Sequence, residues 1–246
     1  MLRLVQRPSP NFNERADVDG PDILLMHYTG MQSCEAAVQR LTDPVARVSS
    51  HYTVDEDGTV YAHVEERLRA WHAGVSHWRG ETDINSRSIG IEIVNPGHEF
   101  GYRAFPETQI EAVIALSHGI LSRHRIPARN VIAHSDIAPG RKEDPGELFP
   151  WKRFADEGIG IWLEAAAASG ASLAPGDRGE AVRGLQMDLA RYGYGIDVTT
   201  EFDARTRDVV IAFQRHFRPV LFDGVADRET QGILQGLLIG LADAVS

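Results

Sequence analysis

The residues best suited to chemistry are gathered in one short segment, AHSDIAPGRKEDPGELFPW at residues 133–151. Two Pro-Gly pairs within it exclude a continuous helix, so we expect a loop. This loop holds His134, Lys142 and Asp144. Imidazole and carboxylate groups ligate zinc, and a neighbouring lysine can stabilise developing negative charge. The segment therefore predicts some of the residues of a zinc site, and the remaining residues must come from elsewhere in the chain.

A second histidine occupies a comparable position earlier in the chain. His27 follows the apolar run at residues 23–26, as His134 follows the run at 131–133. Both runs are typical of buried strands, and sites in α/β sheets collect just beyond such strands. A catalytic zinc site needs three protein ligands and one open position for water. His27, His134 and Asp144 could supply two nitrogens and one oxygen, although most of the ten histidines are expected to be structural or surface residues.

Glu92 lies within the β-rich run IGIEIV at residues 89–94. An ionised carboxylate among apolar strand residues is costly unless it is paired, hydrogen bonded or beside a metal. One interpretation places Glu92 at an exposed strand end, and the other makes it a general base with a pKa near neutrality. Lys142 has the same two interpretations, a solvated loop lysine or a donor to an oxyanion.

Strands that alternate with helices must position these residues. Ser33 is the expected N-cap of a helix, and the sequence HYTVDEDGTVYAHV around Asp57 and Gly58 has a strong hairpin signal. Pro106 can open a helix whose apolar residues share one face until Pro127 ends it. The alternation predicts an α/β fold, and the hairpin makes the central β-sheet mixed, with helices flanking it.

A change of composition at EAAAASGASLAPGD predicts two domains. We expect a catalytic domain over residues 1–165, a linker over 166–176 and a small three-helix C-terminal domain over 177–246. Three apolar helical faces occur in this tail, and Asp203 and Asp227 are expected helix N-caps in a weak repeat. Its aromatic residues are most simply core.

The composition and the first residues indicate which classes of partner are disfavoured and in which compartment we expect the protein. The formal net charge of -10 disfavours nucleic acid and anionic membrane surfaces. We find no apolar run near the roughly 20 residues of a membrane span. The single cysteine, Cys34, cannot form an internal disulfide and is expected to pack within a helix. The start MLRLVQRPSPNFN has no uninterrupted apolar segment before its prolines, which predicts a cytoplasmic protein, or a periplasmic one if the N-terminus has been trimmed.

Four motifs in order give the sequence a family resemblance. They are MHYTG around His27, WHAG at residues 71–74, NSRSIGIEIVNPG around Glu92, and AHSDIAPGRKEDPG. Together they resemble the type 2 N-acetylmuramoyl-L-alanine amidases, the AmpD-like zinc amidases related to peptidoglycan recognition proteins, over about residues 5–155. The tail, with GDRGEAVRGLQMDL and VVIAFQRHF, is similar to the small three-helix peptidoglycan-binding modules often fused to wall hydrolases.

The resemblance implies a peptidoglycan-recognition-protein-like fold and a set of roles. One Zn²⁺ per chain would be held by His27, His134 and Asp144. Glu92 would accept a proton and Lys142 would stabilise the transition state. The reaction implied is hydrolysis of the amide between the lactyl group of (1,6-anhydro-)N-acetylmuramic acid and L-alanine.

Three further residues are candidates for binding muropeptide or peptidoglycan fragments. Arg47 stands just before the hairpin, where the family has an arginine that contacts the muramyl-peptide. Trp71 and His72 could line the groove for sugar or peptide. A packed tryptophan beside a hydrogen-bonded histidine is the alternative for this pair.

We therefore predict an amidase of cytoplasmic peptidoglycan recycling that acts on soluble anhydro-muropeptides. A periplasmic or secreted amidase of the polymeric wall is one alternative, which the C-terminal module would suit. A recognition protein that binds wall fragments without cutting them is another. The complete ligand set and Glu92 argue against a binding-only protein.

Overall fold

The computed structural model describes residues 2–16, 18–164 and 170–243. The chain divides into two compact units. The first comprises Met1–Ser76, Asp83–His134 and Asp144–Ile161, and the second comprises His77–Thr82, Ser135–Glu143 and Trp162–Ser246. The predicted boundary at residues 165 and 166 lies outside the described residues.

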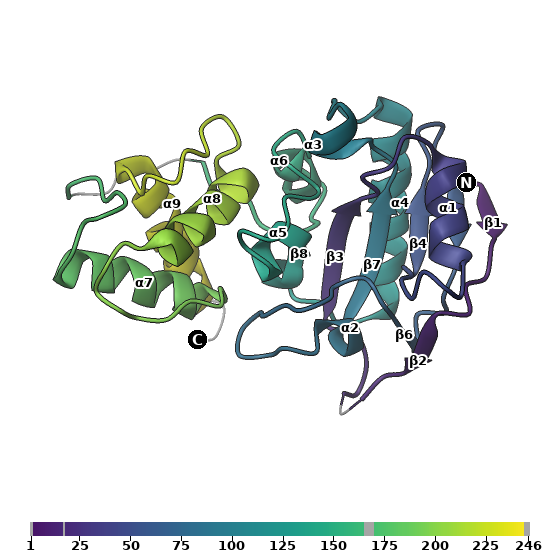
Figure 1. Ribbon diagram of the computed structural model, residues 1–246, viewed down its shortest axis with the longest axis horizontal. Helices are drawn as coiled ribbons and strands as arrows, with labels where there is room; N and C mark the ends of the chain where they lie inside the picture. The colour runs from purple at the N-terminus through teal and green to yellow at the C-terminus, as the bar shows by residue number, and fades with distance from the viewer. Residues whose placement is uncertain (1, 17, 165–169, 244–246) are drawn as a thin grey trace. The chain divides into compact units, whose positions relative to one another are not determined.

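A six-stranded sheet forms the centre of the first unit, with strand order β1-β5-β4-β7-β3-β8. Its strands are β1 (Leu4–Gln6), β3 (Ile23–Tyr28), β4 (Tyr52–Val54), β5 (Val60–Ala62), β7 (Ser88–Ile93) and β8 (Val131–Ala133). The hairpin pair β4 and β5 is antiparallel, and the other neighbours are parallel. The predicted mixed sheet is therefore confirmed, with β7, β3 and β8 side by side (Figure 1).

The two inner strands β3 and β7 carry the core of this sheet. Leu24, Leu25 and Met26 of β3 are fully buried, as are Ile89 and Ile91 of β7. Burying a side chain of this size stabilises a fold by about 1.5–3 kcal/mol. The continuous apolar runs therefore indicated correctly a pair of parallel strands buried on both faces.

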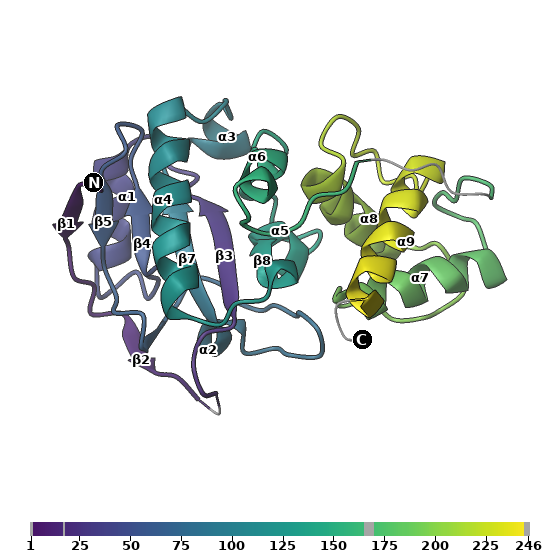
Figure 2. The ribbon, with the colours of Figure 1, turned by 180° about the vertical axis from the view of Figure 1, so that it is seen from behind.

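The hairpin and the flanking helices begin where the sequence predicts. The β4–β5 turn passes through Gly58, whose φ of 82° favours glycine. Ser33 caps α1 (Cys34–Thr42) by accepting a hydrogen bond from the Ala36 amide. Pro106 precedes α4 (Glu107–Arg123), which lies across one face of the sheet (Figure 2). Gln109 of α4 donates to the carbonyl groups of Val54 in β4 and of Val94 just after β7, which ties the helix to the sheet.

Several short elements complete this unit. A two-stranded antiparallel sheet pairs β2 with β6. The short elements are β2 (Phe12–Glu14), β6 (Leu68–Ala70), α2 (Ile84–Arg87), α3 (Gly97–Phe100), the 3₁₀ helix η1 (Ala128–Asn130), α5 (His134–Ile137), which crosses into the second unit, and α6 (Trp151–Asp156).

Three helices dominate the second unit, α7 (Glu180–Tyr192), α8 (Ala204–Phe217) and α9 (Arg228–Asp243). The caps of α8 and α9 have the predicted form, because Asp203 accepts from the Thr206 amide at 2.7 Å and Asp227 from the Thr230 amide at 2.9 Å. Tyr192, Phe213 and Phe217 are at most 2% exposed, which confirms the aromatic residues as core. Within residues 2–16, 18–164 and 170–243, none of the helices has the length and apolar character needed to cross a membrane.

The second unit also contains a buried carboxylate that the sequence did not predict. Asp136, in α5, is 0% exposed. It accepts hydrogen bonds from Tyr194 Oη at 2.6 Å and His216 Nδ1 at 2.7 Å. Trp78 packs edge-on against Tyr192 and Tyr194. The segments 77–82 and 135–143 therefore belong to the same compact unit as the C-terminal helices.

Candidate metal centre

The register of three parallel strands brings the candidate site residues to one level of the sheet. His27 on β3 is level with Glu92 on β7, and Met26 is level with Ala133 on β8. His134 follows Ala133 directly and so comes level with His27. Side chains at matched positions of neighbouring strands point to the same face, with strands about 4.8 Å apart. β7 and β3 thus carry Glu92 and His27 at the same level, and α5, which begins directly after β8, places His134 Nδ1 2.9 Å from His27 Nδ1.

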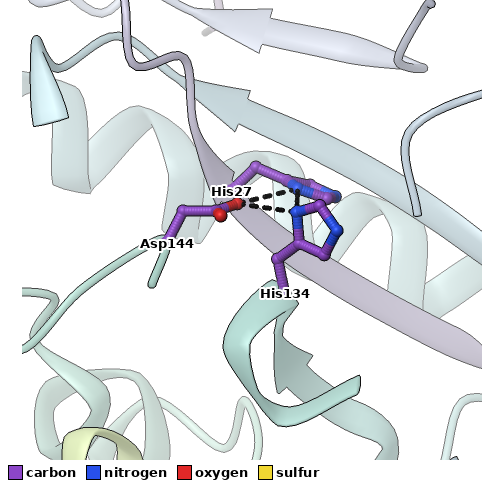
Figure 3. Close-up of side chains that lie close together, drawn as sticks. All are labelled: His27, His134 and Asp144. Atoms are coloured by element: carbon purple, nitrogen blue, oxygen red, sulfur yellow. Dashed lines mark hydrogen bonds and ion pairs between the residues drawn. The ribbon is translucent and has the colours of Figure 1, made fainter. Parts of the chain in front are cut away.

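Three ligand atoms converge at this level (Figure 3). His27 Nδ1 lies 2.9 Å from His134 Nδ1, and Asp144 Oδ2 lies 3.0 Å from each of these nitrogens. All three residues are buried, with exposures of 5% or less. The structure therefore brings together the three residues that the sequence singled out as metal ligands.

The turn that follows Asp144 is held by a tyrosine. Tyr102 Oη donates to the Pro145 carbonyl at 2.8 Å and accepts from the Leu148 amide at 3.0 Å. The Tyr102 ring stacks on His98 with centroids 4.3 Å apart. The backbone on the C-terminal side of Asp144 is thus fixed by a side chain from a different part of the first unit.

The outer nitrogen of each histidine is also hydrogen bonded. His134 Nε2 lies 3.0 Å from the Ala73 carbonyl oxygen, and His27 Nε2 lies 3.0 Å from His72 Nδ1. A carbonyl oxygen can only accept, so His134 carries a proton on Nε2. In the neutral ring the lone pair is then on Nδ1, which faces the cluster. This is the tautomer that a metal ligand requires.

The charge of the cluster suits a divalent cation. Burial alone would raise the pKa of Asp144, but the interactions with His134 and His27, each 3.0 Å away, hold that pKa well below its usual range. Asp144 is therefore a carboxylate at neutral pH. Two imidazole nitrogens and one carboxylate oxygen are a donor set of catalytic zinc sites, which leave a fourth position open. The residues present fit a zinc ion.

Two histidines behind the cluster are neutral at physiological pH. Burial lowers the pKa of His51 to about 3, and burial together with the neighbouring His27 lowers the pKa of His72 well below its usual range. His51 Nδ1 accepts from the Gly90 amide at 3.0 Å, and its Nε2 donates to the Leu68 carbonyl at 3.1 Å. The rings of His51 and His72 therefore contact their neighbours through hydrogen bonds and carry no positive charge.

The other predicted site residues lie in different surroundings. Glu92 is half-buried on β7, and Lys142 is half-buried in the second unit, where its amide donates to the Ala138 carbonyl. Arg47 is exposed, with a positive φ of 52°. Trp71 is half-buried and donates from Nε1 to Asn13 Oδ1 at 2.6 Å. The catalytic roles of Glu92 and Lys142 and the binding roles of Arg47, Trp71 and His72 stay predictions.

The sequence indicated His72 as a candidate site residue, but neither its contact with His27 nor the contact of the Ala73 carbonyl with His134 was predicted. The Ala73 carbonyl is a backbone group, which carries no side-chain signal. Gly90 carried a signal, because an isolated glycine within a strand indicates close approach of another group. A Cβ at Gly90 would lie 2.5 Å from His72 Nδ1. The same strand places Ser88 beside His72, with Oγ and Nε2 3.4 Å apart.

Two family models match the chain. A family described as N-acetylmuramoyl-L-alanine amidase matches residues 17–147, and a family of peptidoglycan binding domains matches residues 178–234. The first match includes the three candidate metal ligands and Glu92. The second includes α7 and α8 and part of α9.

Among curated proteins the chain is similar to named amidases. It is 42% identical over 231 residues to N-acetylmuramoyl-L-alanine amidase AmiD of Escherichia coli, covering 88% of this chain and 82% of that protein. It is 33% identical over 164 residues to 1,6-anhydro-N-acetylmuramyl-L-alanine amidase AmpD of Citrobacter freundii, covering 60% of this chain and 86% of that protein.

Solved structures agree with the sequence matches. The chain superposes on E. coli AmiD, solved in complex with the substrate anhydro-N-acetylmuramic acid-L-Ala-D-γ-Glu-L-Lys, with a TM-score of 0.78 and 38% identity. That match covers 94% of this chain and 98% of the other. AmpDh3 from Pseudomonas aeruginosa gives a TM-score of 0.76 at 32% identity, covering 92% and 95%.

Proposed function

Because the chain belongs to the N-acetylmuramoyl-L-alanine amidase family and is an enzyme of this class, we propose that it is a zinc amidase of muropeptides. The bond cleaved is the amide between the lactyl group of N-acetylmuramic acid and L-alanine of the stem peptide. The observation that carries the zinc assignment is the convergence of His27 Nδ1, His134 Nδ1 and Asp144 Oδ2 within about one hydrogen-bond length of one another.

His27, His134 and Asp144 would hold the zinc ion. Zinc in such a site supplies Lewis-acid chemistry, which polarises an amide carbonyl and lowers the pKa of water to about 7. The rest of the reaction is assigned to side chains of this protein. The strand register supports the role proposed for Glu92.

Glu92 is proposed as the general base and acid. Its carboxylate takes a proton from the water that attacks the lactyl carbonyl carbon, and later gives that proton to the nitrogen of the leaving L-alanine. The C–N bond breaks as the amine departs, which leaves a carboxylic acid on the muramic acid and a free peptide. The register supports this role because Glu92 is level with His27 on the adjacent strand. Lys142 would stabilise negative charge on the carbonyl oxygen.

The enzyme assay uses mass analysis of the products. Anhydro-N-acetylmuramic acid linked to a stem peptide should be converted to the sugar acid and the free peptide. The purified chain should contain about one zinc ion, and His134→Ala should lose it. A metal-free wild-type protein with full activity would refute the zinc assignment.

Glu92→Gln separates the general base from the metal site. We expect turnover to fall by about a hundredfold to ten-thousandfold, the usual scale for one general base, with zinc retained. Glu111→Gln is the matched control, since Glu111 is exposed on α4. Normal turnover of Glu92→Gln would remove Glu92 from the reaction. Wild-type protein that binds the fragments without releasing peptide would instead be a recognition protein.

The substrate is proposed to be soluble anhydro-muropeptide in cytoplasmic recycling. Relatives named as 1,6-anhydro-N-acetylmuramyl-L-alanine amidases support the anhydro form. Polymeric peptidoglycan is the second candidate, and the match of residues 178–234 to peptidoglycan binding domains favours it. Digesting anhydro-muropeptide and intact sacculi side by side distinguishes the two substrates. Fractionation of native cells tests the compartment, and recovery outside the inner membrane would contradict a cytoplasmic role.

A further inference from the structure

We propose that Ser88, His72 and Gly90 form a positioning unit that fixes the ring orientation and the tautomer of His27, and thereby sets the metal affinity of the site. This inference rests on the proposed metal centre. The three residues do not contact the bound metal in this scheme, and the contact of His72 with His27 is separate from the substrate contact predicted for His72. They act through His27.

In this positioning unit, the Ile84 carbonyl determines which atoms donate and which accept in the hydrogen bonds that follow. Ser88 Oγ lies 2.7 Å from the Ile84 carbonyl oxygen, so the hydroxyl donates there. A lone pair of Ser88 Oγ is then available to His72 Nε2, 3.4 Å away. This second contact is long, but its direction is fixed because the hydroxyl proton is already used. His72 therefore carries its proton on Nε2.

The position of the proton on His72 also determines the position of the proton on His27. With the proton of His72 on Nε2, its Nδ1 is an acceptor, and it lies 3.0 Å from His27 Nε2. His27 then carries its proton on Nε2 and presents the lone pair of Nδ1 to the cluster. If His72 held its proton on Nδ1 instead, His27 would be driven to protonate the nitrogen that must bind metal. Partners of this kind orient ligand histidines and increase their basicity.

Gly90 creates the space that this arrangement needs. Ser88, Gly90 and Glu92 alternate along β7 and so face the same side of the sheet. A Cβ at Gly90 would lie 2.5 Å from His72 Nδ1 and 2.6 Å from its Cε1, closer than real Cβ contacts come. Any side chain at position 90 would therefore displace the His72 ring from His27.

The backbone that carries His72 is held by a separate side chain. Asn85 Oδ1 accepts hydrogen bonds from the His72 amide at 3.0 Å and the Ala73 amide at 2.8 Å. The next group along, the Ala73 carbonyl, accepts from His134. Two consecutive residues, His72 and Ala73, thus supply the partners of both ligand histidines. This arrangement makes residues 72–73 a support for the metal site.

The experiment measures zinc affinity of the full-length chain by competition with a chromophoric chelator. Ser88→Ala, Gly90→Ala and His72→Leu should each bind zinc about 10- to 100-fold more weakly, the usual effect of losing an outer partner. His72→Asn should stay within about threefold of wild type, because its Oδ1 can replace the Nδ1 acceptor. Loss in His72→Leu with rescue in His72→Asn separates hydrogen bonding from packing.

A spectroscopic measurement tests the tautomer without zinc. In metal-free wild-type protein, the ¹⁵N signals of His72 should report a proton on Nε2. Ser88→Ala should shift them toward a proton on Nδ1. Ser117→Ala is the matched control, since Ser117 is fully buried and its hydroxyl has no hydrogen-bond partner among the described residues. It should change neither the tautomer nor the affinity.

The results distinguish this inference from the proposed function. Wild-type affinity and a wild-type tautomer in Ser88→Ala would overturn the positioning unit even if the enzyme is a zinc amidase. A wild-type chain that binds no zinc would overturn the zinc assignment, and the His72 tautomer would still decide the hydrogen-bond direction. If Gly90→Ala fails to fold, Ser88→Ala and the two His72 variants carry the test.

Discussion

Replacement of Glu66 should make the first unit less sensitive to acid. Glu66 accepts two hydrogen bonds from Arg123, at 2.7 and 3.0 Å, and one each from His124 and Tyr52, both at 2.7 Å. Burial alone would raise its pKa, but these donors lower it from 4.5 to about 2. One pKa unit is worth about 1.4 kcal/mol, so the ionised form contributes up to about 3 kcal/mol. Because the Arg123 side chain is 50% exposed and solvent screens its charge, we expect ionised Glu66 to contribute about 2 kcal/mol to the free energy of unfolding.

The sign of the effect follows from the lowered pKa. The stabilisation is complete above pH 4.5, the unfolded value, and is lost as the pH falls toward 2. In urea titrations, Glu66→Gln should lower the free energy of unfolding at pH 7, and the gap to wild type should shrink by more than half at pH 3. The control is Glu56→Gln, which breaks the exposed pair with Arg103 and should cost less than about 1 kcal/mol. A gap for Glu66→Gln that does not change with pH would refute the reasoning.

Three further predictions concern other parts of the molecule. Lys142→Met should lower turnover by about a hundredfold to a thousandfold while zinc content stays at wild type, and unchanged turnover would exclude the lysine from charge stabilisation. Tyr194→Phe removes one of the donors to the buried Asp136, so calorimetry should show the second unit destabilised by about 1–3 kcal/mol, and an unchanged melting transition would contradict this. Cys34 should react with iodoacetamide at pH 8 about a thousandfold more slowly than in urea, because burial and a hydrogen bond to Asp55 raise its pKa from 9.0 to about 12.

The positions of the candidate ligands could be predicted because each stands beside a strong local signal. His27 and His134 follow apolar runs that form β3 and the short β8, and these runs are long enough to be read without any partner. Asp144 lies between turn-forming residues. What these signals could not supply is the register of β7 and β8 against β3, since parallel strands are joined by long crossovers that do not fix it. The pairing of Glu92 with His27 in the register of β7 and β3 therefore became known only from the fold.

The division of the ligand loop between two compact units was beyond local reasoning. The sequence presents residues 133–151 as one loop, but the fold assigns residues 135–143 to the unit that contains the C-terminal helices. The physical reason lies in Asp136, whose hydrogen-bond donors Tyr194 and His216 are 58 and 80 residues away in the chain. A buried carboxylate needs such partners, yet nothing in its neighbourhood in the sequence says where they come from.

The pair Trp71 and His72 shows how a site can override local preference. A packed tryptophan beside a hydrogen-bonded histidine is one of the two interpretations of WHAG, and the structure places His72 against His27. That contact depends on Gly90, in a strand whose neighbouring positions are isoleucine. Strand propensity favours a β-branched residue at such a position and disfavours glycine. The absence of a side chain there is explained by the His72 ring, which occupies the space that a Cβ would need. Gly90, which strand propensity disfavours, therefore leaves the space in which His72 contacts the candidate metal ligand His27.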